Sequence, residues 1–148
     1  MHVDKMINLT IKHAKEIATE VCSSLRENIR TPWYHSQSQQ WCILRCTDLY
    51  ENIGKLYHSS KPYYQEVDEY FTKFAKMKYQ EGTPLHELIY AIVMMRRQMW
   101  LFTEGKALVE TGIDLHNRVE TIGKMIHIFD RAIYCVIKNY GELQNKQQ

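Results

Sequence analysis

Glycine and proline are scarce in this sequence, with six glycines and three prolines among 148 residues. A strand-rich fold needs many tight turns, and tight turns draw heavily on these two residues. Their scarcity therefore argues against a β-sandwich or a β-barrel. The composition is 45% hydrophobic and 24% charged, which is typical of a globular chain and excludes a disordered one. The length fits a single domain spanning residues 1–148.

An excess of one charge is also missing, because the net charge is only +2 and the basic residues do not cluster. We therefore expect no nucleic-acid partner. The longest apolar stretch, residues 88–102, is interrupted by Arg96, Arg97 and Gln98, so it falls short of the ~18 apolar residues of a membrane span. The first six residues contain no apolar run typical of a secretory signal. We predict a cytoplasmic protein without a membrane partner.

The patterns that mark catalytic sites are absent as well. We find no paired acids in an apolar setting, no Ser or Cys nucleophile beside a base, and no glycine-rich phosphate loop. His13-Ala14-Lys15 is faintly similar to a phosphotransfer histidine, but it lacks the glycine and serine that usually follow. We predict that the protein is not an enzyme.

What the sequence does contain is helical periodicity, since apolar residues recur every three or four positions in five segments. The predicted helices run from about Asp4 to Ile29, Ser38 to Tyr57, Pro62 to Gln80, Pro84 to Gly105 or Gly112, and Asp114 to Tyr140. The polar tail, residues 142–148, is expected to be flexible. Short connections favour mostly antiparallel packing at shallow angles. The predicted fold class is all-α, a single helical bundle of about five helices, either up-and-down or globin-like.

The clearest break between helices is the segment Gly82-Thr83-Pro84. Gly82 suits the C-terminal end of one helix, and Thr83 suits the N-cap of the next. Pro84 suits a first helical position, where its missing N–H costs nothing. The segment therefore predicts a helix end followed at once by a helix start.

The last predicted helix carries the most regular apolar stripe. Its members, spaced alternately by four and three residues, are Leu115, Val119, Ile122, Ile126, Phe129, Ile133, Val136 and Tyr140. Such a heptad stripe serves either as the centre of a bundle or as the seam of a homodimer. Gly123 beside it either lets another helix approach closely or is a tolerated glycine that costs ~1 kcal/mol. Both pairs of alternatives remain open.

The sequence contains four cysteines, Cys22, Cys42, Cys46 and Cys135, which we expect to be reduced. Cys42 and Cys46 lie four residues apart on the apolar side of the second predicted helix. They could hold zinc with His35 or respond to redox state, or they could be ordinary core thiols. We favour core thiols, because structural zinc sites normally place Cys-x-x-Cys on a loop. No metal site is predicted.

The histidines match no helical metal motif, since neither His-Glu-x-x-His nor Glu-x-x-His occurs. The nearest approaches are the pairs His116 with Glu120 and His127 with Asp130, which lie off the apolar stripe and are expected to be exposed. A haem ligand would be a histidine facing an apolar pocket, and neither His13 nor His86 occupies such a position. We therefore expect no haem or other cofactor.

Part of the chain resembles a known family. Residues 81–100 contain Gly-x-Pro-Leu-x-Glu and then Arg-Arg-x-x-Trp, and Phe129-Asp-Arg-Ala-Ile-Tyr134 and Tyr140 follow near the end. This pattern resembles the N-terminal sensory domain of RsbR/RsbRD-type proteins, the bacterial RsbT co-antagonists. The resemblance implies an all-α stress-response sensor, often followed by a STAS, PAS or histidine-kinase unit; related stressosome domains are globin-like without haem. The 148 residues contain no such output unit, so we expect that the chain either acts alone or is the sensory piece of a longer protein.

We therefore predict a non-enzymatic sensory or regulatory signalling domain, which changes its helix packing or a dimer interface in response to a ligand or partner. The residues expected to contact the small-molecule ligand or partner are Glu87, Arg96, Trp100, Asp130 and Arg131. Arg96 precedes Trp100 by one helical turn, so its guanidinium can lie over the indole. The partner would be a signalling protein or a second copy docked through the 115–140 helix. Two alternatives are a globin-like domain that binds haem or another small ligand, and a helical dimerisation module.

Overall fold

The computed structural model describes residues 2–59, 65–111 and 115–146, and within these ranges it contains seven α-helices and no strand. The predicted all-α fold class is confirmed. The helices are α1 (His2–Lys12), α2 (Ala14–Glu27), α3 (Pro32–His35), α4 (Gln39–Ser59), α5 (Gln65–Glu81), α6 (Leu85–Thr111) and α7 (Leu115–Lys146). The predicted start of the third helix at Pro62 lies outside the described residues.

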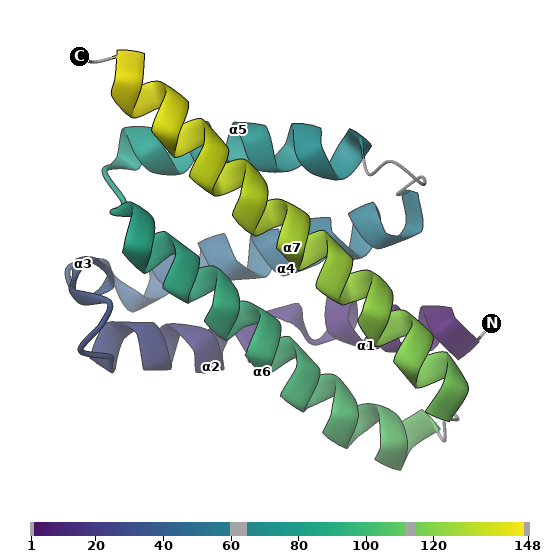
Figure 1. The fold of residues 1–148 in the computed structure, drawn as a ribbon. Helices are drawn as coiled ribbons and strands as arrows, with labels where there is room; N and C mark the ends of the chain where they lie inside the picture. The colour runs from purple at the N-terminus through teal and green to yellow at the C-terminus, as the bar shows by residue number, and fades with distance from the viewer. Residues whose placement is uncertain (1, 60–64, 112–114, 147–148) are drawn as a thin grey trace.

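The helices form two layers (Figure 1). The long helices α6 and α7 lie against each other across one side of the molecule, and α1, α2, α4 and α5 lie behind them. Within the back layer α2 packs extensively against α4, whereas α7 crosses over to pack chiefly on α5. The layers therefore cross diagonally, and the shallow antiparallel packing that we predicted describes only part of the bundle. Within the described residues, no helix combines the length and apolar character needed to cross a bilayer.

The first predicted helix is divided into α1 and α2 in the structure. The division lies at His13, where the backbone leaves helical geometry with a φ of −105° and a ψ of 19°. Nδ1 of His13 lies 2.9 Å from Oε2 of Glu16, and its ring centroid lies 5.1 Å from that of Phe102 on α6. Apolar periodicity does not register a one-residue break of this kind, because the hydrogen bonds from His13 N to Leu9 O and from Ile17 N to His13 O are kept.

Helix α2 ends at Glu27, two residues before the predicted end at Ile29. Asn28 adopts an extended conformation, so Ile29 leaves the apolar face and is 87% exposed. The buried hydroxyl of Thr31 then donates to the carbonyl of Leu25 at 2.6 Å and satisfies an otherwise open helix end. Immediately afterwards, Pro32 begins the four-residue helix α3, which the sequence did not predict.

The predicted break at Gly82 is confirmed. Gly82 has a φ of +86°, and the N–H of Thr83 donates to the carbonyl of Lys78 at 3.1 Å, which is the hydrogen bond of a Schellman C-cap. The predicted N-cap role of Thr83 is wrong, because its buried hydroxyl has no hydrogen-bond partner among the described residues. Its carbonyl instead accepts the hydroxyl of Tyr140 at 2.8 Å, which ties α7 to this turn.

Both long helices extend beyond the earliest C-terminal end that the sequence predicted for them. Helix α6 runs through Gly105 to Thr111, and α7 passes Gly141 to end at Lys146, so the predicted helix end at Tyr140 is wrong. A glycine can remain in a helix at a cost of only about 1 kcal/mol, so its presence in the sequence does not by itself mark a helix end.

The buried face of α7 differs from the predicted stripe at its N-terminal end. From residue 119 onwards, the buried residues of α7 are Thr121, Met125, Ile128, Phe129, Ala132, Cys135, Val136, Asn139 and Tyr140. Val119, a stripe member, is 60% exposed, and Ile122, Ile126 and Ile133 are only half-buried. A straight α-helix drifts by ~20° per heptad relative to a strict seven-residue repeat. The stripe and the core therefore coincide at Phe129, Val136 and Tyr140 and separate towards the start of the helix.

Glycine permits a close helix approach at Gly54, whereas Gly123 fits the other alternative, a tolerated helical glycine. A Cβ on Gly54 of α4 would overlap Cγ1 and Cδ1 of Ile11 on α1. A Cβ on Gly123 would meet nothing within 4 Å. Gly54 therefore sets how closely α1 lies on α4.

Candidate functional site: a buried cluster of three thiols

The predicted contact residues divide among three places in the structure. Arg96 of α6 and Asp130 of α7 meet across the helix pair, with Nη1 of Arg96 3.4 Å from Oδ1 of Asp130. Trp100, one turn after Arg96, is 41% exposed and lines the same cavity as Arg96. These three residues therefore share one edge of the molecule, whereas Glu87 and Arg131 lie elsewhere.

The cavity beside Arg96 and Trp100 lies between α1, α6 and α7 and is lined mainly by apolar side chains, among them Met125 and Phe129. Its volume of about 20 Å³ is enough for about one water molecule. A porphyrin would require the three helices to separate. Among the histidines whose side chains the structure describes, none is buried. The haem alternative therefore gains no support from these residues.

Glu87 is an internal anchor. It is 3% exposed, and its Oε1 accepts the backbone N–H of Trp33 at 2.8 Å. This N–H lies in the first turn of α3, where backbone donors have no partner within the helix. Glu87 therefore fixes α3 to α6, a role that the Gly-x-Pro-Leu-x-Glu pattern alone did not indicate.

Arg131 forms a bidentate ion pair with Asp68, which joins α7 to α5. Its Nε and Nη2 donate to the two carboxylate oxygens of Asp68 at 3.0 and 2.5 Å. The hydrogen bonds from Arg131 are the main cause of a pKa for Asp68 below its usual value of 3.8, although partial burial opposes them. The thiol of Cys135, 3.6 Å from Oδ1 of Asp68, belongs to the same group, and its burial raises its pKa to about 11.

This ion pair predicts a pH dependence of stability. Because the pKa of Asp68 is lower in the folded state, its contribution is present above about pH 4 and is lost as the pH falls through the folded value. We expect Asp68→Asn to lower the free energy of unfolding at pH 7 by up to about 1 kcal/mol, since the pair is partly exposed. At roughly pH 2 to 3, the variant and the parent protein should have nearly the same free energy of unfolding. Urea titrations at both pH values measure this.

The matched control is Asp130→Asn, because Asp130 makes a single 3.4 Å contact with Arg96 on a more exposed surface. Its effect at pH 7 should be smaller than that of Asp68→Asn. Equal losses in both variants at both pH values would contradict the assignment to the Asp68–Arg131 pair.

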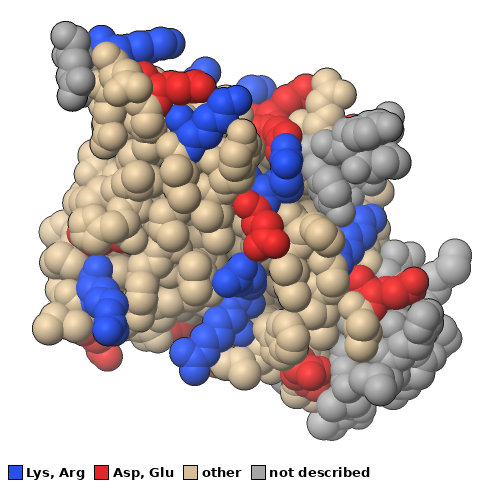
Figure 2. All heavy atoms as spheres, in the orientation of Figure 1, with Lys and Arg blue, Asp and Glu red and all other residues tan. Residues whose placement is uncertain are grey.

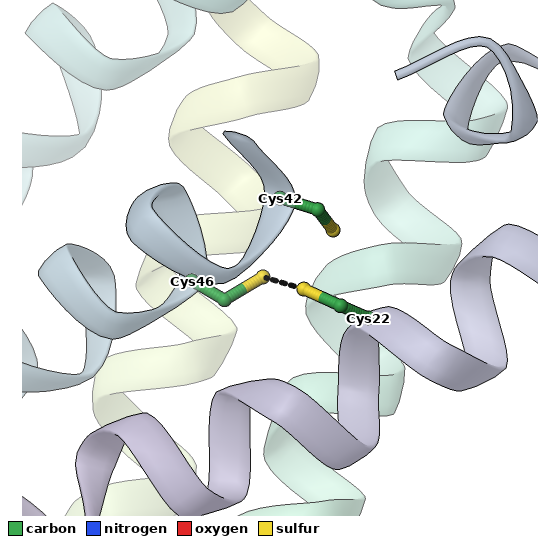
Figure 3. Close-up of side chains that lie close together, drawn as sticks. All are labelled: Cys22, Cys42 and Cys46. Carbon is green, nitrogen blue, oxygen red and sulfur yellow. Dashed lines mark hydrogen bonds between the residues drawn. The ribbon is translucent and has the colours of Figure 1, made fainter. Parts of the chain in front are cut away.

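Three buried thiols meet where α2 packs against α4 (Figure 3). Cys42 and Cys46 lie one turn apart on α4, and Cys22 faces them from α2. Their Sγ atoms all lie within 4.8 Å of one another, and Cys22 Sγ and Cys46 Sγ are 3.7 Å apart. The exposures of Cys22, Cys42 and Cys46 are 0%, 1% and 7%. We call these three residues the thiol cluster.

The three thiols differ in how readily they lose a proton. Hydrogen bonds from Cys22 and then from Cys46 lower the pKa of Cys42, because they stabilise a thiolate there. The hydrogen bond with Cys42 raises the pKa of Cys22, although the hydrogen bond with Cys46 opposes this shift. Hydrogen bonds with Cys22 and then with Cys42, together with burial, raise the pKa of Cys46. The three thiols are therefore coupled, so that a thiolate on one of them disfavours ionisation of the other two.

A buried cation lies beside the cluster. Lys78 of α5 is 4% exposed and, with Cys42 and Cys46, lines a cavity of about 30 Å³. Its Nζ lies 4.9 Å from the ring centroid of Trp41 and 3.6 Å from Oε1 of Glu81. Burial lowers the pKa of Lys78, whereas Glu81 opposes this shift. Its positive charge also lowers the pKa of Cys42.

The sequence found two members of the thiol cluster and missed the third. Cys42 and Cys46 are one turn apart on a single helix, but Cys22 lies on α2, and no spacing rule connects it to them. The expectation that Cys42 and Cys46 are core thiols agrees with their burial. The alternative zinc site with His35 is wrong in its ligand, because the exposed His35 contacts the carbonyl of Asn28 through Nε2 at 2.7 Å and is not part of the cluster.

Comparisons with protein-family models, with curated proteins and with solved structures find no match for this chain. The functional argument therefore depends on the residues themselves.

Proposed function

We propose that this chain is a non-enzymatic regulatory domain that senses a chemical change at the thiol cluster of Cys22, Cys42 and Cys46. The observation that carries the proposal is the convergence of three thiols from two helices, with the buried cation Lys78 beside them. An apolar core needs neither feature, and a buried charged group is costly to keep. A ligand or reaction that favours one arrangement of the sulfur atoms would shift the packing of α2 on α4.

The burial of the cluster favours sensing over catalysis. Catalytic cysteines are typically partly exposed, so that a substrate can reach the thiolate. The cluster thiols are at most 7% exposed, and within the described residues the group includes no histidine or carboxylate to act as a base. A small ion or oxidant can reach sulfur atoms by local opening of the helices, whereas a large substrate cannot. The setting that we propose is the cytoplasm, where thiols stay reduced.

The output surface in this proposal is the outer side of α6 and α7. Helix α2 also packs on α6, and α4 also packs on α7, so a shift at the cluster reaches both long helices directly. Large exposed apolar residues on these helices include Trp100, Leu101, Tyr134 and Ile137. Figure 2 shows a broad area without Lys, Arg, Asp or Glu over the first half of α6 and the adjoining part of α7. Exposed apolar patches commonly mark protein interaction sites, which here would bind a signalling protein or a second copy.

The resemblance to the RsbR-type sensory domain supports the same class of function, since it covers residues 81–140 and therefore both helices of the proposed output surface. In this proposal Arg96, Trp100 and Asp130 belong to the output side. Glu87 and Arg131 hold the helices that surround them.

The experiment that tests the function uses diamide as the probe. Two cluster thiols would form a disulfide, and their two protons and two electrons would pass to the N=N bond of diamide and give the hydrazine. We expect several-fold faster amide hydrogen exchange in α6 and α7 after oxidation, measured by mass spectrometry. Cys22→Ala should abolish the response, whereas Cys135→Ala, which removes the cysteine outside the cluster, should keep it. Unchanged exchange in α6 and α7 of a chain shown to be oxidised at the cluster would refute the proposal.

A further inference from the structure

We propose that the thiol cluster of Cys22, Cys42 and Cys46 is a three-coordinate binding site for a soft monovalent metal ion of the Cu(I) type. The inference deepens the proposed function, on which it rests for its biological meaning, by naming the class of ligand. Thiolate sulfur is the donor that Cu(I) prefers among the side chains of proteins.

The geometry of the three sulfur atoms suits a single ion. An ion about 2.3 Å from each of three sulfur atoms in one plane sets the sulfur–sulfur distances at about 4.0 Å. The Sγ atoms of Cys22 and Cys46 are already 3.7 Å apart, and all three lie within 4.8 Å of one another. Figure 3 shows the three side chains pointing towards one common point from α2 and α4. Side-chain movements that change the sulfur–sulfur distances by less than about 1 Å would therefore complete the site.

The surroundings favour three ligands over four. Among the described residues no fourth His, Cys, Asp or Glu joins the cluster. The cavity that Cys42 and Cys46 line has a volume of about 30 Å³, enough for one atom of water size. Its other walls are mainly apolar, including Leu25, Leu88 and Ile92. Structural zinc sites are almost always closed by four protein ligands, so this arrangement suits an ion that accepts three.

The positions of the thiols on helices make the site rigid. Cys42 and Cys46 are one turn apart on α4, and Cys22 lies on the facing side of α2, at one of the most extensive helix interfaces of the fold. Ligands held by packed helices lose little freedom when an ion binds. Each metal–sulfur bond that forms from a thiol releases its proton to solvent, and no electron is transferred.

The experiment adds Cu(I), delivered anaerobically as its acetonitrile complex, to the reduced full chain. We expect one tightly held copper per chain and X-ray absorption showing three sulfur neighbours at about 2.3 Å. Competition with a coloured Cu(I) chelator gives the affinity. Replacing any one of Cys22, Cys42 and Cys46 by alanine should weaken binding by at least about 100-fold, because a direct ligand counts for more than an outer-shell partner. Cys135→Ala should leave the affinity unchanged.

Several outcomes would overturn the inference. They are the absence of retained copper, a copper with only two sulfur neighbours, an equal loss of affinity in Cys135→Ala, and Zn(II) bound more tightly than Cu(I) in the same competition. The sulfur count is measured on the unaltered protein, so it decides the question even if an alanine variant fails to fold. Retained copper without any change in the exchange of α6 and α7 would keep the site and refute the sensory function. A diamide response in a chain that binds no copper would keep the sensory function and refute the copper site.

Discussion

Gly54→Leu should destabilise the fold by about 3 kcal/mol, because even a Cβ at this position overlaps Ile11 on the facing helix α1. The expected loss combines the overpacking of the α1–α4 contact with the displacement of a helix that also packs on α6 and α7. Leucine has a better helix propensity than glycine by nearly 1 kcal/mol, which offsets part of the loss. The free energy of unfolding from urea titration, followed by far-ultraviolet circular dichroism, measures the effect.

Gly123→Leu is the matched control, because a Cβ there meets nothing within 4 Å. This variant gains the same helix propensity without the overlap, so its stability should stay constant or rise by up to about 1 kcal/mol. The double variant Gly54→Leu with Ile11→Ala should lose less than the two single variants combined, since the alanine makes room for the leucine. Similar losses at Gly54 and Gly123 would show that α1 does not approach α4 as described.

Glu87→Ala should lower the free energy of unfolding by about 1–3 kcal/mol, because it leaves the N–H of Trp33 without its acceptor at the start of α3. Glu87→Gln keeps an oxygen at the same place and should cost well below half as much. Hydrogen exchange of the Trp33 amide provides a local readout, which should accelerate in the alanine variant and stay slow in the glutamine variant. An alanine variant as stable as the parent would exclude the anchoring role and would return Glu87 to the group of ligand-contact candidates.

The sequence predicted the helical segments well, because burial on one face of a helix leaves a direct periodic trace. Leu88, Ile92, Met95 and Met99 of α6 are all buried as their spacing requires. The break at Gly82 was predictable because a positive φ strongly favours glycine, and Gly82 has a φ of +86°. These features depend on interactions within a few residues of chain.

Features that depend on distant residues were not predictable in this way. The break at His13 coincides with a ring contact to Phe102, about ninety residues later in the chain. The thiol cluster combines a spacing rule on α4 with Cys22, whose position depends on how α2 lies on α4. The stripe of α7 was regular in sequence, but helical drift carried Val119 out into solvent. Short-range patterns therefore identify the helices, whereas the site arises from their packing.

Helix α7 has a consequence for how the protein is made. Its described side chains include four that are at most 1% exposed, Ile128, Phe129, Ala132 and Val136, and the helix packs on α1, α4, α5 and α6. While the ribosome still holds these residues, the earlier helices have no partner for the surfaces that α7 will cover. The nascent chain must therefore keep this apolar surface open to chaperones until α7 has emerged from the ribosome and can pack on the earlier helices.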